Sequence, residues 1–451
     1  MDLDRRENLK VMNKKKLLLE LLIAMVALSG CGKTNAEQSD VAVIELKGNK
    51  ATLNGETVEE FDYTWHSAPS KSEEWYEGTE PDTDKKAYIA HDIWYYPELN
   101  EDGFEIVDYD GETEWAYNYT AEGLTDYIYA TLPVQGENVP VEMMHSAEEA
   151  YANPVLHITQ PGTYSIQGDW NGQIMIDLGE RDKTFSDENS KVKIILNGVD
   201  VKCTVAPAFI AYSAFECDNG WEEREKYSNT VSTSEAGVNI EIADNSINSF
   251  SGTNIYRMLK PQYKKEGSSV QKKLRKIDGT FYSFVSMNIS GQEKATGILN
   301  ITSGFEGLND ELHLTINSGN INIYAQNDGI NVNEDNVSVF TMNGGTLHVF
   351  AGLGAEGDGI DSNGYIVVNG GMIAGGTPSG SDELLDSDCG NTVNGGEVIT
   401  IGSGKGAGMP GRGMPGGEMH GGEFDGFGKE PPMDFDRGKR PGRPEDFESD
   451  K

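Results

Sequence analysis

The sequence predicts an all-β protein whose main domain is a parallel β-helix, a solenoid of short stacked strands. One basis is a repeat in which Asn-Gly-Gly or Asn-Ser-Gly recurs. The last glycines of the four copies, in steps of 26, 26 and 25 residues, are Gly319, Gly345, Gly371 and Gly396. The other basis is the segments between them, such as Asn320–Tyr324 and Thr346–Phe350, which alternate polar and apolar residues as strands do. A fixed period in this range is typical of solenoids, in which each repeat packs against its neighbours.

The first element of the chain is a predicted lipoprotein signal peptide over residues 1–30. Three lysines, Lys14–Lys16, precede an apolar run that ends at Leu28, and Leu28-Ser29-Gly30-Cys31 follows. This order of a charged, an apolar and a small-residue region is typical of secretory signals. Leu-Ser-Gly-Cys resembles the bacterial lipoprotein signal, which predicts that Cys31 is lipidated and anchors the chain outside the cytoplasm, on the bacterial cell membrane. A transmembrane anchor is the alternative, but the unbroken apolar run is shorter than ~20 residues.

Residues 31–150 form a predicted acidic, aromatic-rich β module ahead of the solenoid. Four of the six tryptophans, Trp65, Trp75, Trp94 and Trp115, lie here. Exposed aromatic rings could stack on sugars, whereas buried rings would form the core of a small domain, which is the favoured interpretation. The module could also cap the N-terminal end of the solenoid.

The predicted β-helix spans residues 151–403. About 25 residues suffice for one turn of three strands of ~5 residues each. A basic island interrupts this acidic domain, and it could bind an anionic polymer, project as a solvated insertion or pair with the protein's own carboxylates. Its candidate binding residues are Lys264, Lys265, Lys272, Lys273 and Arg275.

Residues 404–451 consist largely of Gly, Met, Pro and charged residues without periodicity, which predicts a disordered tail. Cys203, Cys217 and Cys389 remain after Cys31, too few for a disulfide scaffold. A Cys203–Cys217 disulfide and buried thiols both remain open.

An acidic motif recurs on the same repeat. Its copies are Glu306-Gly307-Leu308-Asn309, Asp328-Gly329-Ile330-Asn331 and Asp358-Gly359-Ile360-Asp361, and a degraded fourth copy is Leu384-Leu385-Asp386. Carboxylates at equivalent positions of neighbouring strands would lie ~4.7–4.9 Å apart, a distance that Ca²⁺ can bridge with oxygen ligands on both sides. Asp and Asn are also ordinary turn formers. For the stacked set we favour Ca²⁺, and the candidate ligands are Asp328, Asn331, Asp335, Asp358, Asp361 and Asp386.

The chain resembles the carbohydrate-binding domain-containing lipoproteins over residues 155–403. The resemblance rests on Gly162–Gly168, Leu196–Val199, the Asp-Gly-Ile turns, Asp361–Gly364 and the Asn-Gly-Gly turns. It implies a right-handed parallel β-helix that binds Ca²⁺, acidic plant polysaccharide (polygalacturonate) and cellulose without demonstrated turnover. It also implies the ligand role for Asp328, Asp358 and Asp361.

The net charge and the motifs limit the functions that this chain could have. The net charge of −38 argues against nucleic-acid binding. We therefore expect surface-anchored, non-catalytic binding of an acidic polysaccharide with Ca²⁺. The runner-up is a pectate-type lyase, since β-elimination needs Ca²⁺ and a base, but residues 306–388 contain no Lys or Arg. A purely structural surface stalk is the third possibility.

Overall fold

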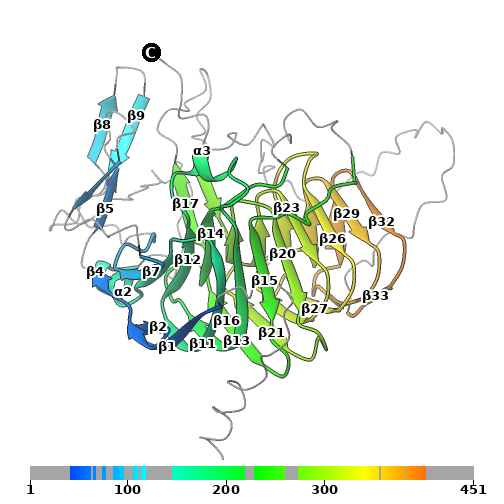
Figure 1. The fold of residues 1–451 in the computed structure, drawn as a ribbon. Coiled ribbons are helices and arrows are strands. Elements are labelled where there is room, and N and C mark those ends of the chain that lie inside the picture. The colour runs from blue at the N-terminus through cyan, green and yellow to red at the C-terminus, as the bar shows by residue number, and fades with distance from the viewer. Residues whose placement is uncertain are drawn as a thin grey trace, which may run out of the picture. The chain divides into compact units, whose positions relative to one another are not determined.

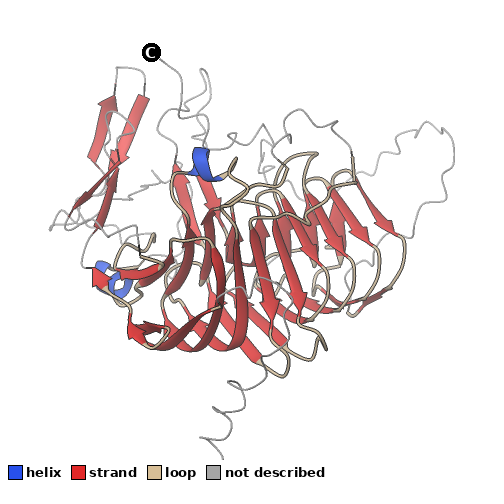
Figure 2. Cartoon of the chain, in the orientation of Figure 1, coloured by secondary structure: helices blue, strands red, loops and turns tan. Residues whose placement is uncertain are grey.

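Most strands of the protein stack into a parallel β-helix with three faces, as the computed structural model shows (Figures 1 and 2). The structure describes residues 41–61, 64–67, 74–77, 85–95, 105–109, 113–117, 145–218, 228–259, 273–354, 357–380 and 382–402. The all-β solenoid that the sequence predicts is therefore confirmed. Within the described ranges, no helix is both long and apolar enough to cross a membrane.

Each turn contributes one strand to each face, and successive turns pair in parallel. The first face contains β13 (Val192–Lys202) in its first half, β15 (Val238–Ile242), β20 (Met287–Gly291), β23 (His313–Ile316), β26 (Val339–Met342), β29 (Tyr365–Val368) and β32 (Gly390–Val393). The second face contains β16 (Ile247–Gly252), β21 (Ile298–Ser303), β24 (Asn320–Ala325), β27 (Thr346–Phe350), β30 (Met372–Gly376) and β33 (Glu397–Thr400).

The third face contains the shortest strands and carries the acidic motif. Its members are β10 (Val155–Ile158), β12 (Gln173–Asp177), β14 (Phe209–Ser213), β19 (Gly279–Ser283), β22 (Glu306–Asp310), β25 (Ile330–Val332), β28 (Ile360–Ser362) and β31 (Leu385–Ser387). The loops on either side of β25 and β28 differ in length, yet these strands stay in register. Variable loops on a rigid scaffold are what the spacing of the motif predicts.

The N-terminal segment extends all three faces. Along the first and the second face, β1 (Ala42–Gly48) pairs in parallel with β11 (Gly162–Asn171), and β2 (Lys50–Leu53) and β3 (Glu56–Thr57) follow in antiparallel. On the third face, β7 (Ala87–Ala90) pairs antiparallel with β10 and parallel with β4 (Glu60–Phe61). These antiparallel strands end the parallel stacking at this end of the solenoid.

The remaining elements are short hairpins and helices. The hairpins are β5 (Thr64–Ser67) with β6 (Glu74–Glu77), β8 (Glu105–Tyr109) with β9 (Thr113–Tyr117), and β17 (Ile255–Leu259) with β18 (Lys273–Ile277). The helices are α2 (Ala147–Tyr151), which begins with a capping box between Ser146 and Glu149, and α3 (Arg181–Thr184). Of the four N-terminal tryptophans, Trp94 packs against the hydrophobic core, and the side chains of the others lie outside the described residues.

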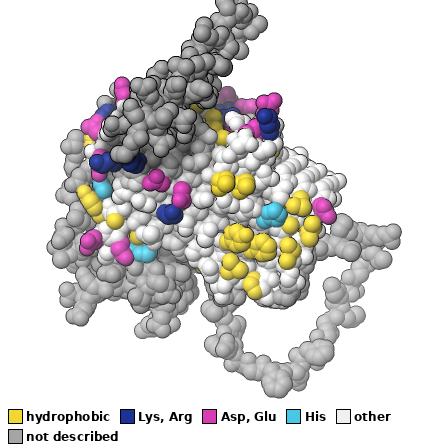
Figure 3. Space-filling view, turned by 90° about the horizontal axis from the view of Figure 1, so that it is seen from below, with side chains coloured by type: hydrophobic (Ala, Val, Ile, Leu, Met, Phe, Trp, Pro, Cys, Tyr) yellow, Lys and Arg dark blue, Asp and Glu magenta, His cyan; other side chains and the backbone are white. Residues whose placement is uncertain are grey.

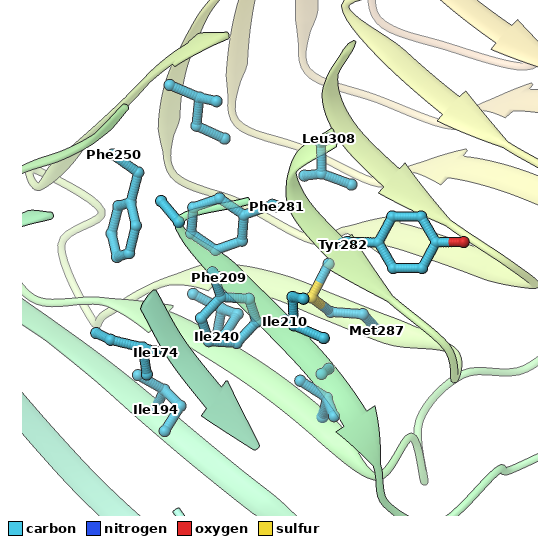
Figure 4. Close-up of a cluster of buried hydrophobic side chains, with 14 of the residues drawn as sticks. Ile174, Ile194, Phe209, Ile210, Ile240, Phe250, Phe281, Tyr282, Met287 and Leu308 are labelled. Carbon is cyan, nitrogen blue, oxygen red and sulfur yellow. The ribbon is translucent and has the colours of Figure 1, made fainter. Parts of the chain in front are cut away.

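The core is a continuous apolar column inside the three faces. Phe281 is fully buried and contacts Phe209 and Phe250, with ring centroids 4.8 Å and 4.5 Å apart (Figure 4). Leu308 of the next turn continues this column in register. Cys203 is a buried thiol, and Cys217 and Cys389 are also free, so the Cys203–Cys217 disulfide does not form.

The Asn-Gly-Gly repeat forms the turns between the first and second faces. Asn343, Asn369 and Asn394 each donate through Nδ2 to Oδ1 of the asparagine one turn earlier, at 2.9, 2.9 and 2.8 Å. The last glycines of these copies have φ values of +86°, +83° and +81°, in the left-handed region that favours glycine. The Asn-Gly-Gly repeat therefore has a structural role: it shapes the turn between the two faces and sets the number of residues in one turn of the solenoid.

Candidate functional site

The acidic motif has an unusual backbone in which two successive side-chain positions face the interior. A Cβ on Gly329 would lie 2.1 Å from Cγ2 of Val349, and a Cβ on Gly307 would lie 2.4 Å from Cγ2 of Ile323. The residue after each glycine, such as Ile330, is fully buried. Because glycine and the following residue both face inward, the residues on either side of this pair project outward together.

The outward residues form two columns along the third face, which we call the acidic columns. In the first column, Gly307, Gly329 and Gly359 donate backbone hydrogen bonds to the carbonyl groups of the acidic residues one turn later. Its members are Glu306, Asp328, Asp358 and Glu383. In the second column, direct strand pairing aligns Asn309, Asn331, Asp361 and Asp386. Neighbouring members are about one strand spacing apart, ~4.7–4.9 Å.

The acidic columns change from buried to exposed along the solenoid. Glu306 and Asn309 are fully buried and Asn331 is 2% exposed, whereas Asp361 is half-buried and Asp386 is exposed. The second column changes in the same direction from neutral amides to carboxylates. The charge that a ligand could reach therefore lies at the C-terminal end of the columns.

At the buried end, amide groups hold the carboxylate of Glu306. It accepts hydrogen bonds from Nδ2 of Asn309 and from Nδ2 of Asn331, the latter at 3.2 Å. The amide oxygen of Asn331 is buried and has no hydrogen-bond partner among the described residues. An unpaired buried oxygen is costly and is satisfied when a cation or water binds beside it.

Further along the first column, the carboxylates of Asp328 and Asp358 each accept a backbone hydrogen bond from the next turn. Oδ1 of Asp328 accepts from the N–H of Asp358 at 2.7 Å, and Oδ1 of Asp358 accepts from the N–H of Glu383 at 2.6 Å. The bonds to Asp328 and Asp358 fix these two carboxylates of the first column in orientation. In the opposite direction, Oδ2 of Asp382, beside the column, accepts from the N–H of Gly357 in the previous turn at 3.2 Å.

The carboxylates of the two columns repel one another. Burial raises the pKa of Asp328 well above its usual range, and the nearby carboxylates of Glu306 and Asp361 raise it further. Burial also raises the pKa of Asp358 to about 6, where the hydrogen bond from Glu383 opposes it and the charge of Asp386 adds to it. Both shifts mean that a positive charge at the columns would be stabilising.

The structure brings together five of the six predicted metal ligands. Asp328 and Asp358 lie in the first column, and Asn331, Asp361 and Asp386 lie in the second. Asp335 lies apart, in the loop after β25, where its Oδ1 accepts a hydrogen bond from Nδ2 of Asn363 at 2.8 Å.

The other predicted site residues are described only in part. Cys31, Lys264, Lys265 and Lys272 lie outside the described residues, whereas Lys273 and Arg275 belong to β18. Three members of the columns, Glu306, Asn309 and Glu383, were not among the predicted ligands. Glu306 and Asn309 belong to the first copy of the acidic motif, so the sequence carried a signal for them.

The donors of the acidic columns are all oxygens, which suits Ca²⁺ rather than a metal that prefers nitrogen or sulfur. Among the described residues, no three His, Cys, Asp or Glu side chains form a group that could hold a metal ion by themselves. A cation here would therefore also need amide oxygens such as that of Asn331, backbone carbonyls, or oxygens of a bound ligand. The unpaired oxygen of Asn331 fits that requirement.

Comparison with known proteins gives a family match over the acidic columns. The model of a family described as carbohydrate-binding domain-containing protein matches residues 222–419, which include all four copies of the acidic motif. No curated protein matches the chain. A solved structure of the polysaccharide lyase-like protein from C. thermocellum, a gadolinium derivative, is 24% identical, with a TM-score of 0.36, and covers 56% of this chain and 87% of that chain.

Proposed function

We propose that this protein binds an acidic polysaccharide without cleaving it, with Ca²⁺ bound between the acidic columns and the glycan. The observation that carries the proposal is the exposed end of the columns, where Asp358, Asp361 and Asp386 present carboxylates on successive turns. The family match over residues 222–419 supports a carbohydrate as the ligand class.

The chain's own charge explains why a cation is needed. A protein with a net charge of −38 and a polyuronate repel each other on direct contact. Ca²⁺ takes six to eight oxygen ligands, and the columns supply only some of them. Ca²⁺ held by carboxylates of the exposed end together with amide or backbone oxygens and oxygens of the glycan would supply the positive charge that joins the columns to uronate carboxylates.

The two ends of the columns have different roles in this proposal. The buried end, with Glu306, Asp328 and Asn331, is enclosed by protein groups and would hold an ion that stabilises the fold. The exposed end, with Asp361 and Asp386, is reachable by a polymer. Because the columns repeat along the solenoid, they suit a ligand that repeats along its own length.

Binding without cleavage is favoured because the site offers no cationic base. β-Elimination requires a group that removes a proton beside the carboxylate, and residues 306–388 contain no Lys or Arg. Incubation with polygalacturonate and Ca²⁺ tests this directly. We expect retention of the protein on the glycan and no rise in the ultraviolet absorbance of unsaturated uronate products. A rise in absorbance would identify a lyase. If the protein is not retained and the absorbance does not rise, the structural surface stalk becomes the favoured interpretation.

Lipid anchoring at Cys31 completes the proposed setting, at the outer surface of a bacterial cell membrane. The motivation is the Leu28–Cys31 signal after an apolar run. Replacement of Cys31 by serine should abolish incorporation of labelled fatty acid and release the protein from the membrane fraction. A variant that is still labelled and membrane-bound would contradict the anchor.

A further inference from the structure

The outer side of the first face is covered, unlike that of the second face. Figure 3 views the second face, where hydrophobic side chains gather at the surface, and Tyr324 of that face is 47% exposed. On the first face, the outward-facing residues Val339, Tyr365 and Val367 are 0%, 8% and 7% exposed and form a cluster separate from the core. They alternate along their strands with core residues such as Ile366, so they point away from the interior. A segment of the chain outside the three faces must therefore cover them.

The cover includes residues 228–236, which we call the strap. The strap precedes β15 in the sequence, yet it contacts strands near the far end of the solenoid. Nδ2 of Asn229 donates to Oγ1 of Thr392 on β32 at 3.3 Å. Oγ1 of Thr233 donates to Oγ1 of Thr315 on β23 at 2.7 Å. These two bonds anchor the strap at positions several turns apart.

Between these anchors, alternate side chains of the strap face the sheet. Val231 is half-buried against the outward cluster of β26 and β29, whereas its neighbour Ser232 is exposed. Thr233 is buried, and its carbonyl oxygen also accepts a hydrogen bond from Nδ2 of Asn288 on β20 at 2.6 Å. The strap thus connects β20 and β23 to β32 through contacts that belong to none of the sheets.

The strap runs across the strands, along the direction in which they stack. Thr315 and Thr392 occupy one register position on β23 and β32, with β26 and β29 between them (Figure 1). Three strand spacings separate them, which is ~14 Å. The chain from Asn229 to Thr233 can span at most ~13–14 Å when fully extended. The strap is therefore close to its full length and cannot follow an outward movement of β32 without losing an anchor.

The C-terminal turn needs such a tie because it has a neighbour on one side only. Each unit of a solenoid is stabilised by the units on both sides of it. Within the described residues, β32 pairs only with β29, and β33 pairs only with β30. The side chains of Val393 and Ile399 on these two strands are exposed.

We infer that the strap is a clamp that holds the C-terminal turns in place from outside the first face and thereby positions Asp386. The strand that carries Asp386, β31, leads directly into β32, which the strap anchors at Thr392. Without the strap, the last turns would open locally while the rest of the solenoid stayed folded. The role of Asp386 as a ligand rests on the proposed function, whereas the clamp itself does not.

The test detaches the strap and measures local opening by hydrogen exchange and mass spectrometry on the full chain in EDTA. Val231→Asp would place a charge against the outward cluster of β26 and β29, where an unpaired charge is costly to bury, so the strap should detach. The backbone amides of β29 and β32 should then exchange at least about tenfold faster, which corresponds to about 1.4 kcal/mol. The amides of β11 and β13, at the other end of the solenoid, should exchange as in the native protein.

Two further variants make the result specific. Ser232→Asp adds the same charge at the exposed neighbouring residue and should leave exchange unchanged. Thr233→Val removes only the hydroxyl group that bonds to Thr315, and it should accelerate the same amides by roughly threefold, as expected for one hydrogen bond. This milder variant decides the question if Val231→Asp does not fold.

Native exchange rates in β29 and β32 of the folded strap variants would overturn the inference. So would an equal acceleration in β11 and β13, or an equal effect of Ser232→Asp. Because neither Ca²⁺ nor glycan is present, a failure of the proposed function would leave these exchange rates unaffected, and the two failures can be told apart.

Discussion

Replacing Asp361 and Asp386 together by asparagine should abolish Ca²⁺-dependent binding of polygalacturonate, with a loss of affinity of about a hundredfold or more. Both residues lie at the exposed end of the second acidic column, on neighbouring strands. Asparagine keeps an oxygen at each position but removes the two charges that would hold the cation. A hundredfold loss corresponds to about 2.7 kcal/mol of binding free energy, which calorimetric titration can resolve.

A matched variant controls for net charge. Asp200→Asn combined with Glu397→Gln also removes two carboxylates, but these belong to strands β13 and β33, and that of Asp200 pairs with Lys202 at 2.9 Å. This control should bind as the native protein does. The Asp361/Asp386 variant should also be at least as stable as the native protein in EDTA, because it removes charges that repel Asp328 and Asp358. Equal loss of binding in both variants would show that binding depends on the net charge of the protein and not on a Ca²⁺ site at the columns.

The second large effect is expected on stability, from Gly329→Ala. The added Cβ would lie 2.1 Å from Cγ2 of Val349 and 2.5 Å from the carbonyl oxygen of Gly359, so the turn must move. Overpacking of this kind costs about 1–3 kcal/mol, and a clash with backbone lies at the upper end. Urea denaturation should show that loss, and Ca²⁺ should stabilise the variant less than the native protein because Asp328 is displaced.

A second substitution separates the two clashes. Val349→Ala removes the side-chain contact of the new Cβ but not its contact with the carbonyl oxygen of Gly359. Gly329→Ala should therefore lower the free energy of unfolding less in a Val349→Ala background than in the native protein, although it should still lower it. If Gly329→Ala unfolds at the same urea concentration as the native protein, the backbone account of the acidic motif fails.

The fold could be predicted from sequence because each turn repeats its own local chemistry. Asn343, Asn369 and Asn394 recur at the length of one turn since their side chains must hydrogen-bond to each other across neighbouring turns. The pairing of β1 with β11 and of β7 with β10 could not be predicted in the same way. These contacts join segments far apart in the chain and belong to no repeat.

The acidic columns were predictable in part. Asp361 and Asp386 follow from their spacing, whereas Glu306 and Asn309 were placed in the first copy of the motif but not among the candidate ligands. The structure also explains Leu384, which stands in place of the motif's glycine in the last copy. No further third-face strand stacks on β31 among the described residues, and the Leu384 side chain is buried in the core.

The charge-free stretch of the second face, which consists of β16, β21, β24, β27 and β30, could be recognised only in the structure. Along the sequence, these strands alternate with the acidic strands of the third face. The overall composition of the chain therefore hides the difference in charge between the two faces. Tyr324 and Phe350 are 26 residues apart and become neighbours only through the register of β24 and β27. One solenoid thus presents two surfaces of different charge.

The central claim, that Ca²⁺ joins the acidic columns to an acidic glycan, is tested most directly by one binding isotherm. The affinity of a soluble oligogalacturonate for the full chain is measured at stepped concentrations of free Ca²⁺, with ionic strength held constant. We predict no binding in EDTA and an affinity that rises with free Ca²⁺ to a plateau. An affinity that is the same at every Ca²⁺ concentration would contradict the account.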